Sequence, residues 1–193
     1  MAATASPYGL RPVNVLGGQP NSGAIRKYKI ASTYGTAIFQ GDLVSLLVGG
    51  TIEKNTGTTA ATPVGVFMGV EYTSSDMGFI HKNNWVASTV ATDAMAYVVD
   101  DPDMLFEIQA DDTLGQNAIG SNFALVQDPG DASTGVSGVS LDASSIAATN
   151  TLPLRVVDYV DKEGFSALGD AYTDVIVRLN THFNRAILGL AGA

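Results

Sequence analysis

The two histidines are the first candidates for catalysis, because imidazole gains and loses a proton near neutral pH. His81 lies in an irregular stretch, and His182 follows the last candidate strand. A Ser–His–Asp triad needs its base within hydrogen-bond reach of a nucleophile. The chain has no G-x-S-x-G elbow, no cysteine and no glycine motif of the phosphate-binding kind. We therefore interpret both histidines as structural or surface residues and predict that the protein is not an enzyme.

A cluster of carboxylates is the second candidate for chemistry. Its members are Asp100, Asp101, Asp103, Glu107, Asp111 and Asp112, with no basic residue among them. Hard cations such as calcium bind several carboxylate and carbonyl oxygens. The calcium-loop spacing fails, because the fifth and sixth positions counted from Asp101 are Leu105 and Phe106. A solvated acidic turn is the favoured interpretation, a cation site is the alternative, and we predict no cofactor.

The charges are unevenly distributed along the chain. Residues 1–41 contain Arg11, Arg26, Lys27 and Lys29 and no acid, whereas ten acids and no basic residue lie between positions 82 and 155. Complementary patches of this kind favour contact between copies of a protein. The alternative is that the two patches pair within one subunit. The net charge of −9 repels phosphate backbones, so we expect no nucleic-acid partner.

Residues 94–112, which must position the acidic cluster, carry the clearest structural pattern. Residues 94–99 are apolar and rich in β-formers, and residues 104–109 alternate between apolar and polar positions. Residues 100–103 separate them and include Pro102, which lacks an N–H and therefore suits a turn. The pattern predicts a β-hairpin.

The rest of the chain also indicates short strands. We expect them at 25–30, 37–39, 43–48, 51–54, 63–72, 85–90, 122–127, 154–160 and 173–180. Gly65 and Gly69 inside one of these runs indicate a bulge or a close backbone approach. Only residues 141–148 favour a helical turn, with Asp142 or Ser144 as N-cap. The predicted fold is all-β: an antiparallel β-sandwich or barrel with an extended N-terminal arm and at most one or two short helices.

The two ends of the chain differ from its middle. Residues 1–24 are dense in proline and glycine, which disfavours helix and paired strand alike, so we predict an extended arm. Its apolar residues suit docking on a neighbouring surface, although a frayed terminus is the alternative. Residues 25–185 are expected to form one β-rich globular domain and residues 186–193 an apolar tail. We see neither a leader pattern nor the ~20 apolar residues of a membrane span, so no membrane partner is expected.

Seven segments spread over nearly the whole chain carry a resemblance to known proteins. They are YGLRPV at 8–13, GTAIFQGDLV at 35–44, VGVFMGVEY at 64–72, YVVDDPDMLFEIQ at 97–109, GVSGVSLD at 135–142, LPLRVVDYV at 152–160 and VIVRLNTHFNR at 175–185. Together they resemble the capsid decoration (cement) proteins of tailed bacteriophages. The resemblance implies a structural virion protein that binds the outside of a phage head and stabilises the capsid shell.

The same resemblance implies partners and a location. The partners would be the major capsid protein and further copies of this chain, in a homotrimer. The protein would lie on the outer surface of the head, and in the host cytoplasm during assembly. Together with the charge pattern, this makes the expected capsid or intersubunit contacts Tyr8, Leu10, Arg11, Val13, Arg26, Lys27, Lys29, Asp100, Asp101 and Asp103.

A second class of function stays open. A β-sandwich binding module, such as a carbohydrate-binding or adhesin-like domain of a virion or cell surface, would also be all-β. Such a module normally displays exposed aromatic side chains, and Trp85 is the only tryptophan. A major capsid protein is disfavoured, because the long helix expected of that fold has no counterpart in the sequence.

Overall fold

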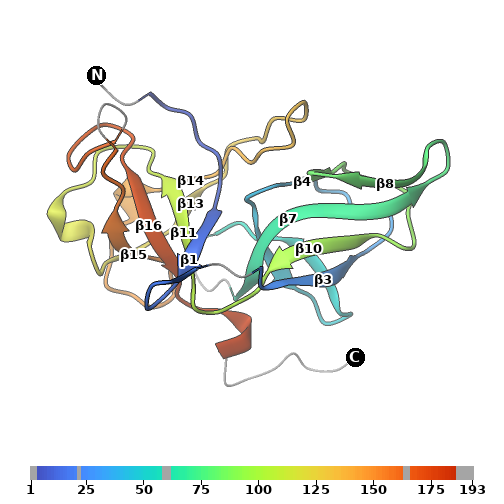
Figure 1. Cartoon of the computed structure of the whole chain (residues 1–193), viewed down its shortest axis with the longest axis horizontal. Coiled ribbons are helices and arrows are strands. Elements are labelled where there is room, and N and C mark those ends of the chain that lie inside the picture. Colours follow the sequence, from blue (N-terminus) through green and yellow to red (C-terminus); the bar gives the residue numbers. More distant parts are fainter. Residues whose placement is uncertain (1–3, 21–22, 58–61, 163–165, 186–193) are drawn as a thin grey trace.

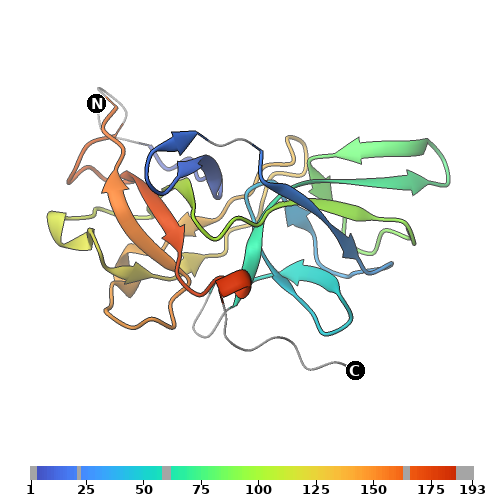
Figure 2. The same ribbon diagram turned by 60° about the horizontal axis from the view of Figure 1, so that its bottom comes forward.

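The computed structural model describes residues 4–20, 23–57, 62–162 and 166–185. Strands make up 45% of the structure and helical residues 5%, and the helical segments of the described ranges are all shorter than seven residues. The prediction of an all-β fold is therefore confirmed. Figures 1 and 2 show two β units side by side along the long axis of the molecule.

The first unit is a six-stranded sheet in which every neighbouring pair is antiparallel. In spatial order its strands are β12 (Asn122–Phe123), β15 (Leu154–Tyr159), β16 (Asp174–Leu179), β11 (Met104–Gln109), β1 (Arg11–Val15) and β2 (Gln19–Pro20). A small pair, β13 (Leu125–Val126) and β14 (Ser140–Leu141), joins the end of β11 through a bridge from Ala110 to Leu141.

The second unit is a five-stranded barrel. Around the ring its strands are β3 (Ile25–Ile30), β6 (Thr51–Lys54), β5 (Leu43–Leu46), β7 (Pro63–Ser74) and β10 (Met95–Val99). The ring closes because β10 pairs with both β3 and β7. Only the β3–β6 pair is parallel among the five ring pairs. Strand β8 (Gly78–Lys82) extends β7 as a hairpin, and β4 (Ile38–Phe39) pairs with β9 (Asn84–Trp85).

The helical segments are single 3₁₀ turns: η1 (Gln116–Ala118), η2 (Ala143–Ser145) and η3 (Phe183–Arg185). Asp142 caps η2, since its carboxylate accepts a hydrogen bond from the Ser144 N–H at 3.0 Å. The predicted helical turn capped by Asp142 is therefore confirmed. Within the described ranges, no helix has the length and apolar character needed to cross a lipid bilayer.

Two adjoining cores hold the units together. The core of the first sheet includes Phe106, Ile108, Phe123, Val156 and Val177, and the barrel interior includes Ile30, Val44, Phe67, Trp85 and Val98. Leu43, Val66 and Val99 lie on barrel strands but pack in the first core. The two units therefore share an apolar junction, and a change in one core is felt at the edge of the other.

The predicted hairpin of residues 94–109 is wrong in its pairing. Both strands exist, but β10 pairs with β3 and β7 in the barrel, whereas β11 pairs with β1 and β16 in the first sheet. The turn between them carries the chain from one unit to the other. Alternation in a sequence predicts a half-buried strand, but it does not specify which strand lies beside it.

The prediction that residues 1–24 lack paired strands is also wrong. Strand β1 lies inside the first sheet between β11 and β2. Pro12 is tolerated there because the β1–β11 register shifts between Pro12 and Val15, and a proline without an N–H fits such an irregularity. The N-terminal segment is thus part of the folded unit. The predicted tail, residues 186–193, lies outside the described residues.

Both glycines singled out in β7 have the expected role. A Cβ at Gly65 would lie 2.1 Å from the carbonyl oxygen of Val99, so only glycine lets β7 approach β10 this closely. Gly69 has φ +148°, and the β7–β10 register shifts beside it. The predicted close approach and bulge are confirmed.

Candidate functional site

The N-terminal segment is held against the first sheet by specific contacts. The Ser6 N–H donates to Gln109 Oε1 at 2.7 Å, and the Gln109 amide donates to the Thr4 carbonyl at 3.3 Å. The Leu10 N–H donates to the Gly41 carbonyl at 2.9 Å, and the Leu10 side chain is 1% exposed. Leu10 was an expected contact with another molecule, and that expectation is wrong because its side chain fills the protein's own core.

Tyr8 lies in a polar cluster on the outer face of the same sheet. Its hydroxyl is within hydrogen-bond distance of Glu107 at 3.2 Å and of Asp174 at 3.1 Å. Lys162 pairs with Glu107, and the Arg11 guanidinium lies 4.3 Å from the centre of the Tyr8 ring. Burial and the two carboxylates raise the pKa of Tyr8, and burial raises the pKa of Asp174. The cluster therefore keeps the phenol protonated and anchors the segment.

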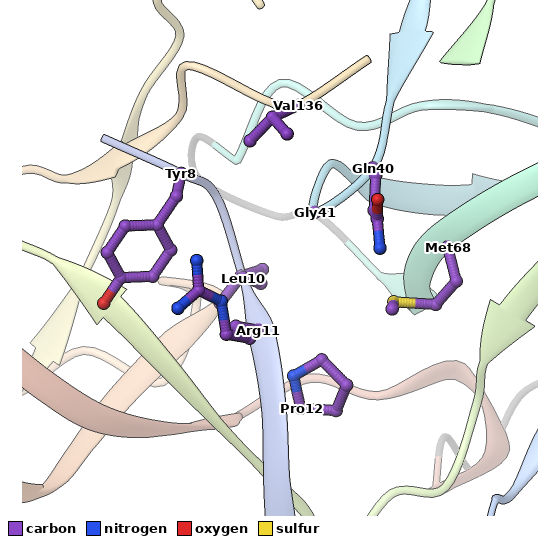
Figure 3. A pocket seen from close by; sticks show the side chains of 8 residues that line it. All are labelled: Tyr8, Leu10, Arg11, Pro12, Gln40, Gly41, Met68 and Val136. Carbon is purple, nitrogen blue, oxygen red and sulfur yellow. The ribbon is translucent and has the colours of Figure 1, made fainter. Parts of the chain in front are cut away.

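A hollow of about 110 Å³ lies beside this cluster, where the two β units meet. Figure 3 shows Tyr8, Arg11 and Pro12 along one wall, with Gln40 and Met68 across from them. Pockets for drug-sized ligands usually enclose roughly 300–1,000 Å³. The hollow is large enough for a few water molecules and too small for a typical organic ligand.

The predicted basic run and acidic turn meet within one subunit. Arg26 Nε lies 3.1 Å from Asp100 Oδ2, and the Tyr28 hydroxyl donates to the same oxygen at 2.8 Å. Asp100 is only 6% exposed. Burial, together with the Asp100 carboxylate, raises the pKa of Tyr28 to about 12. Arg26 and Asp100 therefore pair within one subunit, as the alternative had it. Asp100 is buried, whereas the Arg26 side chain is 66% exposed and stays open to a further contact.

The other two basic residues of the run differ: Lys27 is paired within the subunit, and Lys29 is exposed. Lys27 Nζ lies 2.5 Å from Glu71, which also accepts a hydrogen bond from the Tyr97 hydroxyl. Lys29 is exposed and has no ion pair within the described residues. Val13 is 40% exposed and stays available to another molecule. Among the predicted contacts outside the acidic turn, the structure therefore leaves five residues exposed: Arg11, Val13, Arg26, Lys27 and Lys29.

The acidic turn is not arranged as a cation site. Asp101 Oδ1 accepts a hydrogen bond from the Asp103 N–H at 2.8 Å, and the Asp103 carboxylate pairs with Arg185. In the described parts of the chain, no three histidine, aspartate or glutamate side chains gather as metal ligands would. The turn instead joins β10 of the barrel to β11 of the first sheet, and its Asp103 holds Arg185 of η3 through an ion pair.

The two histidines have different surroundings. His182 is 1% exposed, its Nδ1 accepts the Asn184 N–H at 3.1 Å, and burial lowers its pKa. His81 is exposed on β8, with its ring centre 5.4 Å from that of Tyr97. Across the described residues, neither imidazole is hydrogen-bonded to a serine or an acidic side chain. The absence of enzymatic activity stays a prediction.

Two surfaces were missed by the sequence interpretation. One is the end of the barrel, where Met77, Phe79 and Val90 are 65%, 69% and 75% exposed; we call these three side chains the apolar tip. The other is the outer face of β15 and β16, where Arg155 lies directly opposite Arg178. The alternation of residues 173–180 indicated the outward face of Arg178, but only the strand pairing brings the two arginines together.

Comparison with known proteins adds no identification. No family model matches the chain, and no curated protein or solved structure matches it either.

Proposed function

We propose that this protein is a structural virion protein that binds the outside of a bacteriophage head and stabilises the capsid shell. Its partners are the major capsid protein and further copies of itself in a homotrimer. It acts on the outer surface of the head and is present in the host cytoplasm during assembly. The family resemblance supplies this assignment, and one structural observation supports it.

That observation is the apolar tip. Met77 lies in the β7–β8 turn, Phe79 lies opposite Thr73 across the hairpin, and Val90 lines a hollow with Thr73. Figure 1 shows the hairpin projecting from the end of the barrel. Single exposed apolar residues are ordinary, whereas a gathered group at a projecting end is typical of a contact surface. Covering a large apolar side chain fully contributes roughly 1.5–3 kcal/mol.

We propose the apolar tip, rather than the N-terminal segment, as the attachment surface. Leu10 and Asp100 are internal, so they cannot carry the attachment. The exposed carboxylates Asp76 and Asp93 stand beside the tip. Each copy on a shell would add its own contribution. We therefore assign the contact with the major capsid protein to Met77, Phe79 and Val90.

The binding-module alternative has less support. Trp85 is fully buried and packs edge-on against Tyr72, with ring centres 5.7 Å apart. The single tryptophan therefore cannot stack on a sugar. Phe79 is the large aromatic residue that the described structure exposes most, and the other side chains of the tip, Met77 and Val90, are not aromatic.

A co-sedimentation assay tests the proposal. Heads that lack the protein, from the phage that encodes it, are mixed with purified protein and pelleted. Wild-type protein should pellet with the heads, and Met77→Ser with Phe79→Ser should greatly reduce the bound fraction. The matched control is Ile146→Ser with Leu168→Ser, which removes exposed apolar side chains elsewhere.

The possible failures have separate meanings. Wild-type protein that stays in the supernatant would overturn the proposed function. Equal binding by the tip and control variants would retain the function but reject the apolar tip as the attachment surface.

A further inference from the structure

Arg155 and Arg178 form a pair on the outward face of the first sheet. They lie directly opposite each other across β15 and β16, while the alternate residues Val156 and Val177 face the core. Like charges directly opposite each other in a sheet are destabilising. The two arginines repel each other. The chain has a net charge of −9, so acidic residues that could neutralise such a pair are abundant in it.

Neither arginine forms an ion pair with an acidic side chain among the described residues. Arg155 Nε donates to Asn122 Oδ1 at 3.0 Å, and this acceptor is neutral. Arg178 makes no hydrogen bond or ion pair in the described structure, and its Nε is buried without an acceptor. The nearby Arg185 is committed to Asp103. Burial and the charges of Arg185 and Arg155 lower the pKa of Arg178, and the opposing effect of the Asp103 carboxylate offsets this only in part.

A carboxylate is the group that fits these donors. A guanidinium presents its N–H groups in a planar fork that matches the two oxygens of a carboxylate. One carboxylate between the arginines would supply acceptors for Arg178 and offset the repulsion. A nucleic-acid phosphate would meet repulsion from the rest of this acidic chain.

The chain itself carries suitable carboxylates. It has 19 acidic and 10 basic residues, and in the described structure five of the basic residues already have acidic partners. Asp112 and Asp128 are exposed. Asp128 precedes Gly130, which contacts Phe39 of β4, and Figure 1 shows β4 in the barrel unit, apart from β15. An exposed aspartate of a second molecule can therefore supply the carboxylate.

We propose that Arg155 and Arg178 form a carboxylate-binding site that a second copy of this chain fills with an exposed aspartate. The contact joins unlike surfaces on two copies, and such head-to-tail contacts close into rings when the rotation between copies permits. The inference concerns the isolated protein and does not depend on attachment to a phage head.

Analytical ultracentrifugation of the full chain over a concentration series tests the site. Wild-type protein should self-associate, and added salt should weaken the association because the contact is ionic. Arg178→Gln should weaken association roughly tenfold or more, since it removes a charge-assisted pair. Arg178→Lys should fall between them, because it keeps the charge but loses the fork.

Lys82→Gln is the matched control, because it removes one positive charge from strand β8, outside the expected intersubunit contacts. It should associate like the wild-type protein, and circular dichroism should show that all variants are folded. A wild-type protein that stays monomeric throughout the series would overturn the proposed site, and so would equal association by Arg178→Gln and Lys82→Gln. The inference rests on the proposed self-association, so a monomeric wild-type protein would also reject the homotrimer. Head binding is measured separately through the apolar tip, and that part of the proposal would remain.

Discussion

Replacing Leu10 with alanine should remove a large part of the protein's stability, although the sequence around Leu10 reads like a loose arm. The side chain is 1% exposed and packs in the first core with Leu43, Val66 and Val99 of the barrel strands. Alanine in its place would leave a cavity at the junction of the two units.

The size of the effect follows from the burial. Leucine-to-alanine changes in a closed core cost about 2–5 kcal/mol, because transfer energy is lost and a cavity is left. The total stability of a domain is typically about 5–15 kcal/mol. The substitution should therefore remove between a tenth and the whole of that reserve, whereas the same change on a free arm should cost less than about 0.5 kcal/mol.

Urea unfolding measures the difference. The fluorescence of Trp85, which is fully buried in the barrel, reports on one unit, and far-ultraviolet circular dichroism reports on both. Leu16→Ala is the matched control, because Leu16 follows β1 directly and is 43% exposed. Its midpoint should stay close to that of the wild-type protein, with an unchanged slope.

The result that would refute this reasoning is a small and equal effect of the two substitutions. In that case the N-terminal segment would be a detachable arm after all, and the pairing of β1 with β11 would contribute nothing measurable to stability.

Three further changes test other parts of the structure. Gly65→Ala should destabilise the protein by about 1–3 kcal/mol or more in urea unfolding, because its Cβ would lie 2.1 Å from the Val99 carbonyl oxygen. Burial lowers the pKa of His182, so the free energy of unfolding should fall as the pH drops below about 6.5, and His182→Gln should weaken that fall in a pH series of thermal melts. Burial raises the pKa of Asp174, so its contribution to stability is greatest below pH 3.8 and is lost as the pH rises; Asp174→Asn, which can still accept from Tyr8, should therefore raise the melting temperature more at neutral pH than at acid pH.

The sequence predicted the strands better than their partners. Alternation over 104–109 placed Met104, Phe106 and Ile108 on the core face, and all three are buried. Period-two alternation records which face of a strand is covered, and this is a local property. Pairing depends on contacts between distant segments, so the division of residues 94–109 between two sheets could not be inferred from the pattern alone.

The candidate surfaces were harder to predict for a related reason. The basic run and the acidic turn were visible in the sequence, but whether they pair internally depends on β3 lying beside β10. Arg155 and Arg178 belong to strands that were predicted, yet their pairing follows from the register of β15 and β16. Proline and glycine density predicted an arm. That prediction failed because nothing in the local sequence shows that Pro12 falls at a register shift.

Electron microscopy of assembled heads tests the proposed function most directly. Reconstructions of heads with and without this protein should differ by density on the outer surface of the shell, into which the structure fits with the β7–β8 hairpin against the major capsid protein. Heads assembled with the protein that show no added outer density would contradict the account.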